Sequence, residues 1–386
     1  MDNEVFSISD QEMLVPREVI KVIGVGGAGG NALNTIIQSS IEEVDFIAAN
    51  TDVAALRLSD ASCKVILGRN LTKGRGAGSN PEVGCKAAEE SVDELTELLD
   101  GSDMVFITAG MGGGTGTGAA PIIADIAKEK IGALVVAIVT FPFKWEGTRR
   151  KKNAIEGIAK LREKVDALVI VENDRIVQLS DKSTTSTEAY KMSDEVLRQA
   201  VTGVSSVIRK VTKVNVDFAD VCTTMRNAGT AIMGVGEAEG EGRVIAAARR
   251  AMEGPLMTAP MNGASSVLYC IESGEDIGIL EMTEAVELIA ATAREDANIV
   301  WGQGIDPSMG DKVRFTLIAT GFSETPSDSV SNPDSVSTFS GAEGVPEKRV
   351  SLTPGNVVSE HQTGNIFKGI VEAGADIPTA LRRRKK

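Results

Sequence analysis

Five short apolar runs, each followed by a segment with helical spacing, constrain the fold of this chain more than any other feature. The runs are rich in Val, Ile and Ala, and they are continuous rather than alternating with polar residues. Such runs are typical of strands that are buried on both faces of a parallel sheet. The alternation therefore predicts βαβ units and an α/β, Rossmann-like, doubly wound parallel sheet. The predicted strands are 19–26, 44–50, 104–110, 133–141 and 167–173.

Two of these predicted strands end in glycine-rich loops that open helices. The first loop, 24–31, reads GVGGAGGN and has G-x-G-x-x-G spacing; the second, 111–121, reads MGGGTGTGAAP and contains no lysine. Glycine lets the backbone approach phosphates closely, and a helix that begins there presents free N–H groups. Thr115 and Thr117 add hydroxyl donors to the second loop. Together the two loops predict a polyphosphate site, although the first loop alone could be a tight turn that serves packing.

Composition and charge exclude several classes of protein. The chain has 386 residues, enough for two domains and a tail, and a formal net charge of −14, which argues against a nucleic-acid partner. Four scattered cysteines and a single histidine, His361, predict neither a disulfide framework nor a zinc site. The polar, acidic start is unlike a signal peptide, and the longest apolar run, 131–141, is about half of a membrane span. We expect a cytoplasmic protein.

Two helices are predicted with defined limits. One spans 81–100, because Asn80 is a favourable N-cap, Pro81 suits the first helical position and Gly101 ends the run. A long central helix is predicted over 188–211, with Met192, Val196, Ala200, Val204, Val207 and Val211 on one face. Beyond it, apolar runs at 231–240, 265–273, 297–305 and 312–322 alternate with helices near 241–253 and 279–293 and predict a second α/β domain.

The composition changes after residue 322. Residues 323–374 are rich in Ser, Pro, Asp, Gly and Thr, and a segment with so few apolar residues is expected to remain a disordered linker. The chain then ends in DIPTALRRRKK, with five cations in the last five positions. This end is either a solubilising basic tail or a short docking peptide that is attracted to a membrane surface.

Several motifs occur together and in order: GVGGAGGNA, FIAANTD, NPEVGCKAAEES, GGGTGTG, PFKWEGTRR and NVDFADV. With them, residues 19–322 resemble the tubulin/FtsZ family, and most closely its bacterial cell-division GTPases, and the likeness returns in the last dozen residues. The resemblance implies a GTP-binding domain at 19–187, the central helix at 188–211 and a C-terminal activation domain at 212–322. A flexible segment at 1–18 would precede them, and an adaptor-binding or membrane-proximal peptide at 375–386 would follow the linker.

The resemblance also implies roles for single residues. Glu146 would lie near the ribose, and Arg150 would balance triphosphate charge, although an exposed i,i+4 ion pair is a competing interpretation. Asp194 would accept the N1 and N2 donors of guanine, with Asn173 nearby and Tyr190 stacking on the base, unless that tyrosine is a core aromatic. The full set of implied nucleotide contacts is Gly27, Ala28, Gly29, Gly30, Asn31, Gly114, Thr115, Gly116, Thr117, Glu146, Arg150, Asn173, Tyr190 and Asp194.

The acids of NVDFADV complete the implied active site. In the family this loop meets the nucleotide of the next subunit, so Asp217 and Asp220 would polarise the attacking water and Asn215 would help to orient them. Mg²⁺ would be held mainly through the phosphates. The implied partner is the protein itself, as a head-to-tail homopolymer that forms the cytokinetic ring at the inner face of the membrane. Division adaptors would bind the terminal peptide through Ile377, Pro378, Leu381 and Arg382.

Two other functions compete with this one. An NAD-dependent oxidoreductase is suggested by the first glycine loop together with Asp45 and Asp52, about 20 residues further along the chain. That interpretation explains neither the second loop nor the acidic pair, and His361 in the linker is a poor candidate for a catalytic acid or base. A tubulin-like protein that assembles without hydrolysis would need an impaired acidic loop, whereas Asp217 and Asp220 are both present.

Overall fold

A computed structural model of the chain describes residues 18–39, 41, 43–178, 180, 181, 183–209, 216–254 and 261–322. All of them belong to one compact unit. Three predicted features lie outside the described residues: the first 17 residues, the linker and the terminal peptide with Ile377, Pro378, Leu381 and Arg382. Asn215 lies outside them as well.

Ten strands form a single sheet with the order β3-β2-β1-β4-β5-β6-β7-β10-β8-β9. Strands β1 to β6 pair in parallel, with Ile20 opposite both Val44 and Met104, and this half has the 3-2-1-4-5-6 order of doubly wound nucleotide-binding sheets. The predicted fold class is confirmed. The strands are β1 Ile20–Val25, β2 Val44–Asn50, β3 Cys63–Ile66, β4 Met104–Gly110, β5 Leu134–Phe141, β6 Ala167–Glu172, β7 Gly229–Glu239, β8 Ser266–Ser273, β9 Asn298–Ile305 and β10 Lys312–Thr320.

Helices cover both faces of the parallel half, because successive side chains of a buried strand point to opposite sides. Val22 and Phe106 pack with α1 and α9, whereas Ile23 and Ile107 pack with α4 to α7. The helices are α1 Gly26–Gln38, α2 Val53–Arg57, α3 Arg69–Thr72, α4 Pro81–Glu90, α5 Val92–Leu99, α6 Thr115–Asp125, the π-helix η1 Ile126–Ile131, η2 Lys144–Glu146, α7 Thr148–Arg162, α8 Asn173–Gln178, α9 Ser186–Arg209, α10 Phe218–Met225, α11 Arg243–Glu253, α12 Ile279–Ala290 and η3 Pro307–Met309.

The helix predicted over 81–100 is two helices, so that prediction is wrong in its continuity. Asn80 caps α4 as expected by accepting a hydrogen bond from Glu82 N, but the chain leaves helical geometry at Ser91, where φ is −103° and ψ is 15°. The Ser91 hydroxyl accepts a hydrogen bond from Gly68 N over 3.1 Å. This hydrogen bond with the loop after β3 accompanies the break between α4 and α5.

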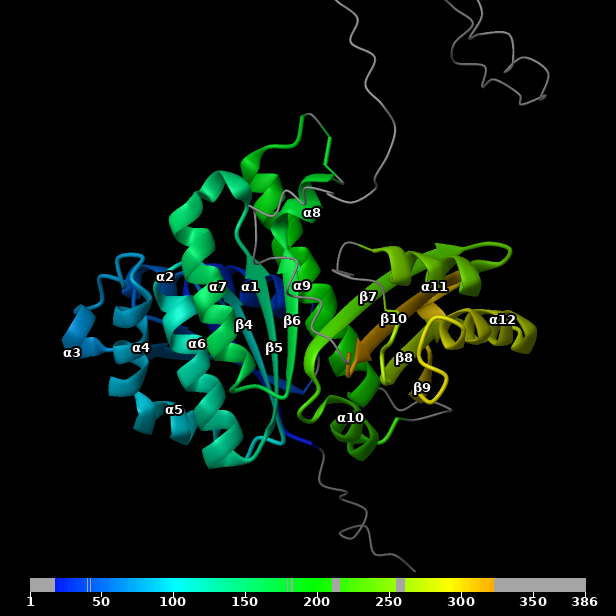
Figure 1. Cartoon of the computed structure of the whole chain (residues 1–386), viewed down its shortest axis with the longest axis horizontal. Coiled ribbons are helices and arrows are strands. Elements are labelled where there is room, and N and C mark those ends of the chain that lie inside the picture. The colour runs from blue at the N-terminus through cyan, green and yellow to red at the C-terminus, as the bar shows by residue number, and fades with distance from the viewer. Residues whose placement is uncertain are drawn as a thin grey trace, which may run out of the picture. The chain divides into compact units, whose positions relative to one another are not determined.

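The long helix α9 lies between the parallel half and the second domain (Figure 1). Val196, Ala200 and Val204 on its predicted apolar face are buried. The second domain joins the same sheet where β7 pairs in parallel with β6 over three residues, and β10 then pairs antiparallel with β7 and β8. Helices α11 and α12 pack on this part of the sheet. None of the described helices is long and apolar enough to span a bilayer.

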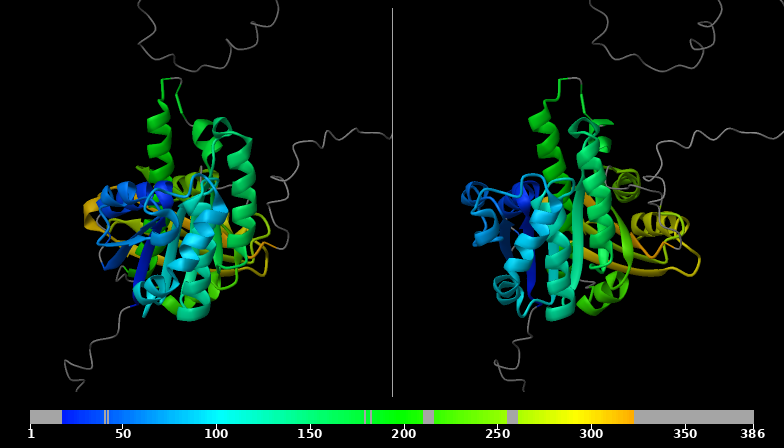
Figure 2. Two further views of the ribbon diagram at one scale, coloured as in Figure 1. Left: turned by 90° about the vertical axis from the view of Figure 1, so that its left-hand side faces the viewer. Right: turned by 60° about the vertical axis from the view of Figure 1, so that its left-hand side comes forward.

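The parallel strands place their carboxyl ends at one edge of the sheet and their amino ends at the opposite edge. β1, β4, β5 and β6 all end at one edge, and α8 follows β6 there. Helix α10 precedes β7, whose first residue, Gly229, pairs with the first residue of β6, Ala167, so α10 lies at the opposite edge. Figures 1 and 2 show α8 and the start of α9 at one end of the molecule and α10 at the other. At about 3.3 Å per residue, the six residues of β6 separate these edges by roughly 20 Å.

Candidate nucleotide site

A pocket of about 260 Å³ opens at the edge where β1, β4, β5 and β6 end. Carboxyl ends of parallel strands are where open α/β sheets bind ligands, because loops and helix starts converge there. The predicted contacts that line it are Gly27, Ala28, Gly114, Thr115, Gly116, Glu146, Arg150, Asn173, Tyr190 and Asp194. Gly29, Gly30, Asn31 and Thr117 are not among its lining residues.

Glycines of the two loops serve two different purposes. A Cβ on Gly29 would lie 2.4 Å from the Thr108 carbonyl oxygen, and one on Gly116 would lie 2.8 Å from the Gly110 carbonyl oxygen. These glycines let the loops pack directly against β4. A Cβ on Gly27 or Gly30 would meet nothing within 4 Å. Space remains on that side of the first loop for a ligand.

The second loop is held in shape by its threonine hydroxyls. The buried Thr117 hydroxyl accepts a hydrogen bond from Gly112 N over 2.9 Å, so the structure places Thr117 in the framework of the loop. Thr115 shares a 2.6 Å hydrogen bond with the hydroxyl of Thr51, which follows β2. Helix α6 begins at Thr115, and its first N–H groups therefore face the pocket, where they favour an anion.

Glu146 and Arg150 line the pocket and form the i,i+4 ion pair that was the competing interpretation of these two residues. The Glu146 side chain is only 9% exposed, and its Oε1 atom accepts a hydrogen bond from Phe143 N over 3.0 Å. The Arg150 side chain is 48% exposed and remains accessible to a ligand. Phe143 is covered by Trp145, with ring centroids 4.0 Å apart, and meets the edge of Tyr190 at 5.2 Å. Because Tyr190 is 42% exposed, it is not a core aromatic.

At the other end of the pocket, the buried amide oxygen of Asn173 accepts a hydrogen bond from Ser193 Oγ over 2.8 Å. The neighbouring carboxyl group of Asp194 is largely removed from water, and burial raises its pKa to about 7. Desolvation disfavours the charged form of an acid, and hydrogen-bond donors of a ligand would reverse that effect. Asp194 is therefore suited to accept two N–H groups from a base.

Sequence reasoning missed several residues that complete the pocket. Ser193 could have been found, because it lies beside Asp194 on the same helix, and Thr140 and Pro142 because they lie where β5 ends. Val25, Met111 and Gly113 belong to the two glycine-rich loops that predicted the site, whereas Gly110 and Leu197 contribute backbone or apolar surface that carries no chemical signal in the sequence. The unpredicted lining residues are Val25, Gly110, Met111, Gly113, Thr140, Pro142, Ser193 and Leu197.

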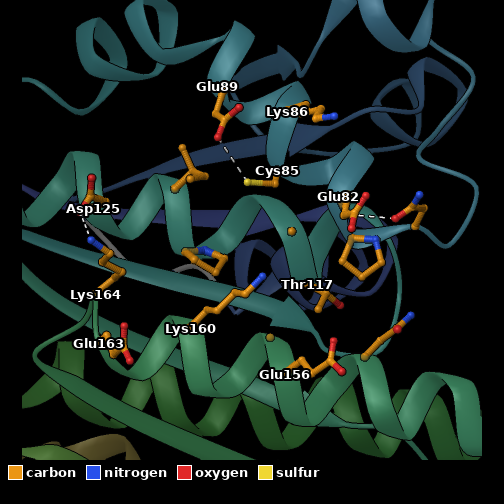
Figure 3. A pocket seen from close by; sticks show the side chains of 17 residues that line it. Glu82, Cys85, Lys86, Glu89, Thr117, Asp125, Glu156, Lys160, Glu163 and Lys164 are labelled. Carbon is orange, nitrogen blue, oxygen red and sulfur yellow. Dashed lines mark hydrogen bonds and ion pairs between the residues drawn. The ribbon is translucent and has the colours of Figure 1, made fainter.

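A second hollow, of about 660 Å³, lies between α4, α6 and α7 (Figure 3). Its charged rim carries five carboxylates against three lysines, which opposes a triphosphate: Glu82, Glu89, Asp125, Glu156 and Glu163 face Lys86, Lys160 and Lys164. Burial raises the pKa of the Cys85 thiol, so that group stays protonated. The smaller pocket, with its glycine loops and helix start, is the better nucleotide site.

The structure does not bring the predicted catalytic acids into the pocket. Asp217 caps α10 by accepting a hydrogen bond from Ala219 N over 3.2 Å, and both Asp217 and Asp220 are exposed. We call α10 with these two acids the acid helix. It lies at the edge of the sheet opposite to the pocket (Figure 1). The acids of one copy therefore cannot reach the pocket of the same copy.

Comparison with known proteins identifies the family. Residues 19–181 match the GTPase domain of the Tubulin/FtsZ family, and residues 229–323 match the C-terminal domain of the FtsZ family. An FtsZ dimer from M. jannaschii is 40% identical, covers 81% of this chain and 90% of its own, and superposes with a TM-score of 0.76. The chain belongs to the tubulin/FtsZ family. It binds and hydrolyses GTP, which removes the oxidoreductase interpretation.

Other solved structures are also similar to this chain. A mutant FtsZ from M. jannaschii is 41% identical, covers 79% of this chain and 92% of its own, and has a TM-score of 0.75. CetZ2 from Haloferax volcanii, solved as a GTPgS-bound protofilament, is 23% identical, covers 81% of this chain and 96% of its own, and shares the fold with a TM-score of 0.71. At 23% identity, the likeness to CetZ2 shows the shared fold alone, and the bacterial origin that the motifs suggested is not shown by these comparisons.

Proposed function

We propose that this GTPase polymerises head to tail and that each active site is shared between two copies. The observation that carries the proposal is the separation within one chain: the pocket lies at the carboxyl edge of the parallel strands, and Asp217 and Asp220 lie exposed at the amino edge. The two edges are roughly 20 Å apart. A contact between unlike surfaces does not close on itself, so it would generate a filament. The FtsZ dimer and the CetZ2 protofilament support such assembly.

Each half of the shared site would contribute separate chemistry. In the pocket, Asp194 accepts guanine N–H groups, the backbone N–H groups of the second loop bind phosphate oxygens, and Arg150 balances their charge. From the adjacent copy, Asp220 and Asp217 accept hydrogen bonds from the attacking water and orient it in line with the γ-phosphate, assisted by Asn215. This division explains why the pocket itself needs no carboxylate near the phosphates.

A magnesium ion fits this site if the phosphates supply most of its ligands. The described residues bring together no group of three His, Cys, Asp or Glu side chains that could hold a metal by themselves. When bound, the ion would neutralise charge that develops on the phosphate oxygens. Thr115, which lines the pocket at the start of α6 and whose hydroxyl is bonded to that of the buried Thr51, would be the protein group to contact its water shell.

We further propose the cellular role and the domain limits that the family resemblance implies. The filaments would form a cytokinetic ring at the inner face of the membrane, in the cytoplasm. The peptide at 375–386 would recruit adaptor proteins through Ile377, Pro378, Leu381 and Arg382. Residues 19–187, 188–211 and 212–322 would act as the GTP-binding domain, the central helix and the activation domain.

The concentration dependence of turnover tests the shared site. Phosphate release should begin only above a threshold protein concentration, together with a rise in light scattering. Asp220→Ala should keep the affinity for GTP and reduce turnover by about a hundredfold or more, since it removes the group that orients water. Turnover that is linear in concentration, with no threshold, would contradict the proposal. Loss of GTP binding in Asp220→Ala would place the acid in its own pocket.

A further inference from the structure

The acid helix is followed by a turn that is held by an unusual set of polar contacts. In this turn, 226–229, Asn227 adopts a left-handed conformation with φ of 54°, and Arg226 N donates back to the Cys222 carbonyl oxygen over 2.8 Å. The turn leads directly into β7, which begins at Gly229. Its geometry therefore determines where the acid helix lies against the parallel half of the sheet.

Asp166 holds this turn from the start of β6. Its side chain is only 3% exposed, and its Oδ1 atom accepts a hydrogen bond from Asn227 N over 3.2 Å. Its Oδ2 atom accepts one from Val135 N over 2.9 Å, and its carbonyl oxygen accepts one from Gly229 N over 3.0 Å. A buried carboxylate with this many directional partners fixes the turn on both sides.

Lys128 supplies the matching positive charge. Its Nζ atom lies 3.0 Å from Asp166 Oδ1 and donates to Asn227 Oδ1 over 2.9 Å and to the Val165 carbonyl oxygen over 3.2 Å. An ammonium group has three donors, and all three are used here. The ion pair is therefore fully satisfied, which is the condition under which a buried pair defines a single geometry.

Lys128 also belongs to the element that forms the pocket. It lies on the π-helix η1, which continues α6 without a break from Thr115 to Ile131. The amino end of this continuous helix is the second glycine loop, and at 1.5 Å per residue it extends for about 25 Å across the molecule. Short π-helical segments often mark functional positions. One continuous helical segment thus connects the phosphate loop to the contacts that Lys128 makes with Asp166 and Asn227.

We propose that Asp166 and Lys128 are positioning residues for hydrolysis in the neighbouring copy. Through Asn227 they set the position of the acid helix relative to the pocket of their own copy, so that Asp217 and Asp220 meet the next nucleotide in the filament. The inference rests on the shared active site proposed above. Thr320 Oγ1, which donates to the Thr224 carbonyl oxygen over 3.0 Å, ties the same helix to the second domain. The contacts among Lys128, Asp166 and Asn227, which we call the charged anchor, connect the acid helix to the GTP-binding side.

Four variants of the full chain test this role. Lys128→Met keeps the aliphatic stem and removes the charge, Lys128→Arg keeps the charge, and Asp166→Asn removes the carboxylate charge at nearly constant volume. Asp125→Asn is the matched control, because Asp125 lies on the same helix and pairs with Lys164 over 2.8 Å without touching the turn. For each variant, we would measure affinity for a fluorescent GTP analogue, the polymerised fraction by sedimentation, and phosphate release per polymerised copy.

We expect Lys128→Met and Asp166→Asn to bind the analogue within about twofold of the natural chain and to reduce turnover per polymerised copy at least tenfold. Lys128→Arg should retain most of the turnover, and Asp125→Asn should retain all of it. If Asp166→Asn proves too unstable, Lys128→Met decides the matter, because it leaves the three backbone contacts of Asp166 in place. Unchanged turnover in the folded Lys128→Met protein would overturn the inference, and so would weakened GTP binding.

Mixed filaments provide a readout that general destabilisation would not move. A mixture of Lys128→Met with the pocket variant Arg150→Ala should recover turnover. Some contacts in the mixed filament join the intact pocket of a Lys128→Met copy to the intact acid helix of an Arg150→Ala copy. In a random equal mixture, about a quarter of contacts are of this kind. A mixture of Lys128→Met with Asp220→Ala should stay inactive, and recovery there would overturn the inference. Full activity of the Asp220→Ala protein, measured without a second variant, would contradict the shared site. Full activity of the Lys128→Met protein, with Asp220→Ala inactive, would contradict only the positioning role.

Discussion

The hydroxyl of Thr117 accepts a hydrogen bond from the backbone N–H of Gly112 across the second glycine loop, over 2.9 Å. Both groups are buried. The loop thereby returns onto the helix that it opens, and the N–H groups of its middle residues are left free to face the pocket. A side chain predicted to touch phosphate instead gives the phosphate-facing backbone its shape.

Thr117→Val should destabilise the protein and weaken GTP binding, because it leaves the buried Gly112 N–H without an acceptor. An unsatisfied buried donor costs about 1–3 kcal/mol. Urea unfolding would measure the loss of stability, and calorimetric titration the loss of affinity. Thr117→Ser retains the hydroxyl and should remain close to the natural chain in affinity. Equal behaviour of the Val and Ser variants would show that the hydrogen bond is unimportant.

Two glycines of the first loop should respond oppositely to a methyl group. Gly29→Ala places a Cβ 2.4 Å from a backbone oxygen of β4 and should lower the free energy of unfolding by about 1–3 kcal/mol or more. Gly27→Ala meets no protein atom within 4 Å, so it should leave stability unchanged while weakening GTP binding. Thermal unfolding and GTP titration of both variants would check this. A stability loss in Gly27→Ala equal to that in Gly29→Ala would contradict the assignment.

GTP affinity should depend on pH through Asp194. Burial raises the pKa of this carboxyl group to about 7, so in the free protein it is mostly protonated below that pH and cannot accept both guanine donors. Affinity should therefore rise with pH up to about 7 and level off above it, approaching tenfold per pH unit on the acidic side. Fluorescent GTP titrations between pH 5.5 and 8.5 would show this, and Asp194→Asn should abolish the dependence.

The same residue should determine which base is bound. Asn offers one acceptor and one donor, a pattern that pairs with the N1–H and O2 of xanthine rather than with the two donors of guanine. Asp194→Asn should consequently lose affinity for GTP and gain affinity for xanthosine triphosphate. Without nucleotide, Asp194→Asn should also be more stable than the natural chain at pH 8, because a raised carboxyl pKa destabilises the folded state once the group is ionised. An unchanged preference for GTP over xanthosine triphosphate would mean that the base does not bind at Asp194.

Tryptophan fluorescence should report occupancy of the pocket. The chain has two tryptophans, and Trp145 is linked to the pocket through aromatic contacts: it stacks on Phe143, which in turn contacts Tyr190, a lining residue. Trp301 stacks on Tyr269 in the second domain. In Trp301→Phe, the emission should change when GTP binds, whereas in Trp145→Phe it should not. A response carried by Trp301 alone would mean that the nucleotide acts at a distance from Trp145.

Strands and loops of the parallel half could be predicted because their signals are local. The runs at 44–50 and 104–110 are the observed β2 and β4, residue for residue. The short edge strand β3 was missed, since Cys63 and Lys64 are exposed and give no apolar run. The break at Ser91 was missed for another reason: the hydrogen bond that accompanies it comes from Gly68, 23 positions away in sequence.

The residue types of the candidate site could be predicted, but not which of them pack against the fold and which face the pocket. Sequence alone cannot distinguish a glycine that packs, such as Gly29, from one that faces open space, such as Gly27, because the difference lies in a strand brought close by folding. The anchor made by Lys128, Asp166 and Asn227 was also invisible. Its members are separated by 38 and 61 positions, 128 to 166 and 166 to 227, and none belongs to a recognised motif.

Placing the pocket and the acid helix at opposite edges of one sheet has a consequence for the ends of a head-to-tail filament. The copy at one end presents a pocket that no neighbour covers, and the copy at the other end presents acids with no nucleotide to act upon. GTP in the uncovered pocket would not be hydrolysed, because the acids that would activate water there are missing. The two ends of each filament would then differ chemically: one would hold unhydrolysed GTP in an uncovered pocket, and the other would expose acids that face no nucleotide.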